Sequence, residues 1–115
     1  MALSTYDISA DQGSDLDTLI TYTDDAGTVI NLTGCSARMQ VRQFAGSSKP
    51  VLDLTSSSGI TLGGAAGTIR ILISAAALSV VPARSYAYDI ELVDTAQVVL
   101  KIISGQFVVN AEVTR

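Results

Sequence analysis

The side chains that could do chemistry in this sequence are few, and none of them is a histidine. The chain therefore has no Ser-His-Asp or Cys-His arrangement and lacks the commonest zinc ligand. Cys35 is the single cysteine, so no intrachain disulfide can form. Its phase with Ala37, Met39 and Val41 predicts a buried free thiol. We expect a protein that is not an enzyme and needs no cofactor.

Two pairs of carboxylates could bind a cation. Asp15 and Asp17 stand two residues apart, which places them on one face of a strand, and Asp24 is followed directly by Asp25. Such pairs could bind calcium weakly or transfer a proton. Further ligands are missing, so solubilising charge explains the first pair and turn chemistry explains the second. We expect no metal site.

The glycine-rich stretch 63–67 has the composition of a phosphate-binding loop but not its pattern. It lacks the following lysine and Ser/Thr, and it leads into a strand. The net charge of −4 argues against nucleic acid, and no apolar run reaches the ~20 residues that span a bilayer. The first residues, MALSTYDIS, lack the charged and apolar regions of a signal peptide, so we expect assembly in the cytoplasm.

Alternation of apolar and polar residues predicts the strands that position these groups. It runs clearly through 15–23, 35–42, 68–73, 86–92 and 98–113. In the last stretch the apolar register shifts at Gly105, which predicts a β-bulge there. Ser74 before three alanines is the one helical signal, and Pro82 limits that helix to one or two turns.

These elements predict one all-β domain over residues 1–115. Seven or eight short strands joined by Gly/Ser turns favour an antiparallel β-sandwich with one short helical turn, and a closed barrel is the alternative. The alternation places a defined set of side chains in the core: Cys35, Met39, Val41, Ile69, Ile71, Ile73, Tyr88, Ile90, Leu92, Leu100 and Ile102.

The composition indicates a surface that other chains partly cover. Hydrophobic residues make up 48% of the chain and charged residues 16%, against about 25% charged residues in average proteins. A surface rich in Ser and Thr is the alternative explanation. Segment 106–113 carries one charge and would expose pairing groups as an edge strand. With the N-terminal arm 2–10 it is the predicted interface to neighbouring subunits, including copies of this chain, through Tyr6, Ile8, Gln106, Val108, Asn110 and Glu112.

Several short segments, taken in their order and spacing, resemble a known family. They are Asn31–Gly34 leading into Ala37–Arg42, Gly59–Leu62 followed by Gly67–Ile69, Ser85–Leu92, Ser104–Gly105 and Glu112–Arg115. Together they resemble small structural proteins of tailed phages and prophages, and the N-terminal β-sandwich of phage upper baseplate proteins. Two departures are Arg84, where such sequences have glycine, and the turn Asp94–Gln97, which lacks a glycine.

The resemblance implies an Ig-like or baseplate-type sandwich with a non-enzymatic structural role in the virion, assembled in the host cytoplasm. The implied position is the tail baseplate or fibre-attachment region, in contact with other phage structural proteins. A head decoration or neck protein of the capsid is the alternative. A carbohydrate-binding module is a third hypothesis, but the chain has no Trp, four Tyr and two Phe to form a stacking surface.

Overall fold

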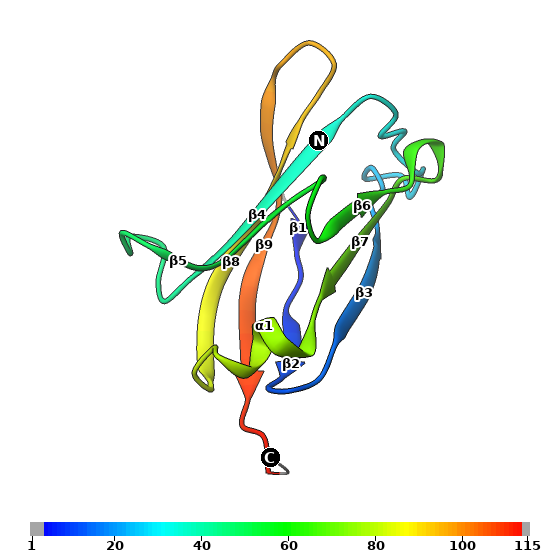
Figure 1. The fold of residues 1–115 in the computed structure, drawn as a ribbon. Coiled ribbons are helices and arrows are strands. Elements are labelled where there is room, and N and C mark those ends of the chain that lie inside the picture. Colours follow the sequence, from blue (N-terminus) through cyan, green and yellow to red (C-terminus); the bar gives the residue numbers. More distant parts are fainter. Residues whose placement is uncertain (1–3, 114–115) are drawn as a thin grey trace.

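The structure is a computed structural model, and it describes residues 4–113 of the 115-residue chain. Two β-sheets pack face to face (Figure 1). The large sheet has the order β1–β9–β8–β4–β5, and β2 follows β1 along β9. The small sheet has the order β3–β7–β6. The predicted all-β sandwich is confirmed, and the strands form two separate sheets rather than one closed barrel.

The bounds of the elements follow the predicted alternation closely. The large sheet consists of β1 (Ser4–Thr5), β2 (Ile8–Asp11), β4 (Ser36–Arg42), β5 (Pro50–Thr55), β8 (Arg84–Val93) and β9 (Val99–Asn110). The small sheet consists of β3 (Leu16–Thr21), β6 (Ile60–Leu62) and β7 (Thr68–Ile73). A 3-10 turn, η1 (Gly64–Ala66), precedes β7, and a short helix, α1 (Ala75–Ser79), follows it.

The core lies between the inward faces of the two sheets. Most of the predicted core residues are buried there: Met39, Val41, Ile69, Ile71, Ile73, Tyr88, Ile90, Leu92 and Ile102. Cys35 and Leu100, also predicted in the core, are only partly buried and pack against it. Phe107, which is fully buried, belongs to the core as well.

The helix α1 forms for the predicted reason. The Ser74 hydroxyl oxygen accepts a hydrogen bond from the Ala77 N–H (3.1 Å), which is the side-chain cap that starts the helix. The N–H of Ala75 donates to the Asp15 carboxylate (2.7 Å), so a second side-chain acceptor binds an N–H group at the start of the same helix. Leu78 is fully buried and fastens the helix to the sandwich.

The β-bulge lies earlier in β9 than the sequence suggests. The register between β8 and β9 shifts between Ile90, which faces Ile103, and Glu91, which faces Lys101. Ile102 is therefore the extra residue, and both Ile102 and Ile103 are buried. The predicted bulge at Gly105 is wrong, because two adjacent apolar residues already absorb the shift in phase.

Two aspartate-initiated turns have the same geometry although only one contains glycine. The Asp24 carboxylate accepts from the N–H groups of Ala26 and Thr28, and Asp94 accepts in the same way from Ala96 and Val98, each at 2.9 Å. The fourth residue has positive φ in both turns: 84° at Gly27 and 67° at Gln97. Gln97 is the only non-glycine residue with positive φ among residues 4–113.

Replacing Gln97 with glycine is expected to raise the free energy of unfolding by about 0.5 kcal/mol. A left-handed conformation costs an L-residue roughly 1–2 kcal/mol, and the greater freedom of glycine in the unfolded chain offsets part of the gain. Chemical denaturation of both proteins measures the difference. The matched control is Ala96→Gly, at a position without positive φ, which should destabilise. Equal effects of the two substitutions would contradict this explanation.

Candidate interaction surface

The outer face of the large sheet is a regular array of outward side chains. We define it as the outward side chains of the four strands β5, β4, β8 and β9. Cross-strand register places Arg38 beside Glu91, Gln40 beside Asp89, and Arg42 beside Ala87. Each of these residues belongs to the register that points away from the core. The face therefore carries rows of polar side chains whose neighbours are set by strand pairing.

Three adjoining hollows make this face concave. The largest, of about 480 Å³, is lined by residues of β4, β8 and β9, including Gln40, Asp89 and Gly105. A hollow of about 220 Å³ shares Gln40, Asp89 and Glu91 with it. A third, of about 270 Å³, shares Ala45, Ala87 and Gly105. Small side chains in the middle of the face leave the space, so a partner's side chain could enter there.

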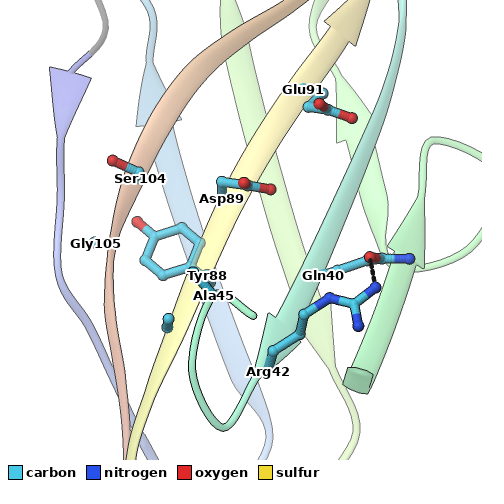
Figure 2. A pocket seen from close by; sticks show the side chains of 9 residues that line it. Gln40, Arg42, Ala45, Tyr88, Asp89, Glu91, Ser104 and Gly105 are labelled. Carbon is cyan, nitrogen blue, oxygen red and sulfur yellow. Dashed lines mark hydrogen bonds between the residues drawn. The ribbon is translucent and has the colours of Figure 1, made fainter. Parts of the chain in front are cut away.

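Charged and polar side chains along the face hold each other in place. Arg38 Nε lies 2.7 Å from Glu91 Oε1, and Lys101 Nζ lies 3.2 Å from Asp89 Oδ2. Arg42 donates to the side-chain oxygen of Gln40 (2.7 Å), the bond drawn in Figure 2. Figure 2 also shows Asp89 and Glu91 on the strand beside β4. Each exposed pair is worth at most ~1 kcal/mol. Their main effect is to fix where positive and negative charge is presented.

An exposed phenylalanine stands at the end of the face where β4 ends. Phe44 lies in the connection between β4 and β5 and lines the third hollow together with Gln43 and Ala45. Its side chain is 59% exposed. Large aromatic side chains with this exposure are typical anchors of protein interfaces.

The predicted C-terminal interface needs a correction. Strand β9 is not an edge, because β8 pairs with one side of it and β1 and β2 pair in parallel with the other. The N-terminal arm occupies the edge of β9 that we expected to be open. Ile8 is buried (3% exposed) opposite Phe107, so its predicted place on a free surface is wrong.

The other predicted interface residues divide into two groups. Gln106, Val108 and Asn110 lie on β9 in the outward register, at the border of the outer face. Tyr6 is 43% exposed between β1 and β2, and Glu112 follows β9, where its N–H donates to the Gln12 side chain (3.1 Å). Ala2 and Leu3 of the predicted arm lie outside the described residues. The contacts expected of these residues with neighbouring subunits stay a prediction.

The arm is held where it crosses Gly105. The N–H of Tyr6 donates to the Ser104 carbonyl (3.0 Å), and the N–H of Gln106 donates to the Asp7 carboxylate (2.9 Å). The Tyr88 hydroxyl, drawn beside Gly105 in Figure 2, donates to the Tyr6 carbonyl. Burial raises the pKa of Tyr88, with the Asp7 charge as a smaller cause, so the phenol stays a donor. A glycine is needed at 105 because a side chain there would meet the arm.

Three of the four paired carboxylates of the sequence have structural roles. Asp17 forms a bidentate pair with Arg70 (2.8 and 2.6 Å), and this hydrogen bonding lowers the pKa of Asp17. Asp15 caps α1 and Asp24 closes a turn. Residues 4–113 contain no cluster of three or more His, Cys, Asp or Glu side chains placed to hold a metal. Asp15 therefore caps the helix α1, and Asp17 forms an ion pair with Arg70.

The remaining candidates also lie in structural positions. The glycine-rich stretch forms η1 and leads into β7, with Gly67 in the left-handed region. Tyr86 and Tyr88 are buried, 3% and 4% exposed, so they form no stacking platform for a sugar. The Tyr86 hydroxyl donates to the Pro82 carbonyl (2.5 Å), the corner contact seen in many β-sandwiches. In the described part of the chain, no helix is long and apolar enough to cross a membrane.

Comparisons with known proteins identify similar folds only. No family model and no curated protein matches the chain. One similar solved structure is an extracellular domain of the voltage-gated sodium channel beta4 subunit, described as a parallel homodimer with a role in cell–cell adhesion. It is 14% identical over 98% of this chain and 97% of that one, with a TM-score of 0.48. A second, from work on cell-adhesive interactions of sodium channel beta subunits, is 14% identical over 96% and 93%, also with a TM-score of 0.48.

These findings correct the function expected from the resemblance. The two similar structures are cell-adhesion domains of sodium channel subunits rather than phage proteins, and no family model links the chain to a phage family. The expectation of a tailed-phage virion protein is therefore wrong, and neither the baseplate nor the capsid role is retained. At 14% identity, the sodium channel subunits carry no argument about what this chain binds.

Proposed function

We propose that this protein is a non-enzymatic β-sandwich that works by protein–protein contact and associates with copies of itself through the outer face of the large sheet. The observation that carries the proposal is the charge balance of that face. Its outward charged residues are three basic and three acidic ones: Arg38, Arg42 and Lys101, with Asp53, Asp89 and Glu91. The rest of the sequence carries four basic and eight acidic residues.

The charge balance matters because two copies of the chain repel each other elsewhere. With a net charge of −4, most pairings of their surfaces bring acidic residues together. A two-fold interface joins the same patch of both copies and must therefore be self-complementary. On the outer face, each basic side chain of one copy can meet a carboxylate of the other. The concave middle supplies room for side chains from the partner.

Substitution of Ala87 with arginine should abolish this association. Ala87 is partly buried where two of the hollows join, so an arginine fills the space and adds an unbalanced charge. Sedimentation measures the mass: wild type should shift with concentration from the 11.9 kDa of one chain to twice that mass, whereas A87R should stay at one chain.

The matched control is Thr61→Arg, an exposed position on β6 of the small sheet. It adds the same charge outside the proposed interface and should associate like wild type. Wild type that remains monomeric at about 1 mM, or equal loss of association in both variants, would refute the proposal.

A further inference from the structure

Strand β3 is an open edge of the small sheet. It pairs with β7 along its whole length, from Leu16 opposite Ile73 to Thr21 opposite Thr68, and the register contains no shift. Within residues 4–113, no strand pairs with its other side, and Figure 1 shows β3 as the outermost strand of that sheet. A partner strand therefore has continuous access to this side, which we call the free side of β3.

The backbone groups of alternate residues point to the free side. In an antiparallel pair, residues that bond the neighbouring strand alternate with residues that do not. The Tyr22 N–H donates to the Gly67 carbonyl (2.8 Å) in the register of β3 and β7, so the even-numbered residues of β3 bond β7. The N–H and C=O groups that point away from β7 belong to Asp17, Leu19 and Thr21.

Strand β3 lacks the features that usually protect an open edge. Such edges carry lysine, proline or a bulge, or another segment covers them. The one charged residue of β3 is Asp17, and its carboxylate is paired with Arg70 (2.6 Å). Leu19, the next outward residue, is 62% exposed. The edge therefore presents an apolar side chain and a charge that is already neutralised.

The core is incomplete along the same edge. The inward side chains of Leu16 and Ile20 pack against the core but are only partly buried. The residues opposite them on β7, Ile73 and Ile69, are 3% and 0% exposed. The difference arises because β7 has a strand on both sides, whereas β3 has one only. A strand added to β3 would cover these side chains with apolar residues of its own.

The surroundings of the edge are acidic. Asp15 directly precedes β3, and Asp24 and Asp25 lie in the turn that follows it. The sequence has no lysine or arginine before Arg38. An extended segment with basic residues at its ends would therefore meet opposite charge at both ends of β3.

A second copy of the chain fits this edge poorly. Antiparallel pairing of two β3 strands about Leu19 sets Asp15 of one copy beside Asp24 of the other, at both ends of the pair. Parallel pairing in register sets Asp17 against Asp17. Like charges across from each other destabilise paired strands, so the charge favours a basic partner over a second copy.

From the open edge, the incomplete core and the surrounding charge, we infer that β3 binds an extended basic segment of another protein by strand addition. The segment bonds the free backbone groups of β3, its inward side chains are apolar and extend the core, and its ends carry lysine or arginine. In such binding, backbone hydrogen bonds supply affinity and alternate side chains supply specificity. The inference does not depend on self-association through the outer face of the large sheet.

Amide hydrogen exchange tests the edge itself. In the protein alone, the amides of Leu19 and Thr21 should exchange at least about tenfold faster than those of Thr18 and Ile20, which bond β7. Equal protection of all four amides, whether by this chain or by a second copy, would overturn the inference because the edge would already be occupied.

Titration with a model peptide tests the binding. The probe is acetyl-Lys-Val-Thr-Val-Thr-Val-Lys-amide, added to ¹⁵N-labelled protein up to about 5 mM, the range for weak binding. Extended, it spans ~23 Å, slightly more than β3, and its valines share one face. We expect saturable shifts and slower exchange of the amides of Asp17, Leu19 and Thr21. The same peptide with glutamine in place of both lysines should bind about fivefold more weakly, because two exposed ion pairs are lost.

Two sets of variants locate the site. Leu19→Pro removes a free N–H without removing a bond to β7 and should abolish binding, whereas Leu19→Ala keeps that N–H and should bind within about threefold of wild type. If Leu19→Pro does not fold, Thr21→Pro takes its place. The double variant Asp15→Asn, Asp25→Asn should weaken the lysine peptide about fivefold and leave the glutamine peptide unchanged. No saturable shifts at these amides, binding that survives the proline substitution, or equal binding of the two peptides would overturn the inference.

Discussion

Replacement of Phe44 with alanine is expected to weaken self-association about 30-fold. Phe44 is the large apolar side chain beside the third hollow of the outer face, and 59% of it is exposed in the single chain. Truncation of an aromatic anchor typically costs an interface about 2 kcal/mol, which corresponds to this factor. The dissociation constant from sedimentation equilibrium of wild type and F44A gives the result.

The matched control for Phe44 is Leu19→Ala. Leu19 is 62% exposed on β3 of the small sheet, so its loss removes similar apolar surface outside the proposed interface. Neither substitution should change the free energy of unfolding by more than about 0.5 kcal/mol, because both side chains are mainly in solvent. An F44A dissociation constant within a factor of two of wild type, or an equal effect of L19A, would show that Phe44 is not an anchor.

Much of the sandwich is predictable from local pattern. Alternation alone placed Met39, Val41 and Ile90 in the core, since the period of a strand decides which face each side chain takes. The same rule placed Arg38, Gln40 and Glu91 outside. Ser74 predicted the start of α1 because its hydroxyl satisfies a free N–H within a few residues. These features depend on neighbours close in the sequence.

The candidate surface was not predictable in the same way. Its hollows arise where Ala45, Ala87 and Gly105 come together from three distant segments. Only the order of the strands in the sheet brings these three residues together, so no local sequence pattern reveals the hollows. The bulge illustrates a related limit: the change of phase between Ile102 and Phe107 was visible, but only the partner strand decides which residue becomes the extra one. We predicted the bulge at Gly105 because glycine is common at bulges.

The edge of the large sheet shows the same limit with a functional consequence. Residues 106–113 have the composition of an open edge, and the structure covers that edge with β1 and β2. Parallel pairing joins Ile8 to Phe107 across almost the whole chain. Nothing in either segment's own pattern specifies the other as its partner. The arm thus blocks the strand edge that would otherwise pair with another chain.

Substitution of Gly105 with alanine is expected to release this arm and to lower the free energy of unfolding by about 3 kcal/mol. An added Cβ would overlap the Tyr6 carbonyl oxygen and lie 2.8 Å from the Asp7 carboxylate. Moving the arm away breaks the three hydrogen bonds that Tyr6 and Asp7 make to Ser104, Gln106 and Tyr88. At about 1 kcal/mol for each bond, their loss accounts for the expected effect.

Chemical denaturation and amide hydrogen exchange together test the Gly105 prediction. In G105A, the amides of Ser9 and Ala10 should lose protection while those of β4 keep it, because only the arm is displaced. Gly46→Ala is the matched control, since a Cβ there meets nothing closer than the Phe44 ring at 3.9 Å. A G105A protein as stable as G46A, with Ser9 and Ala10 still protected, would mean that the arm tolerates a side chain beneath it. A released arm would leave β9 as the open edge, so G105A should also aggregate more readily than G46A.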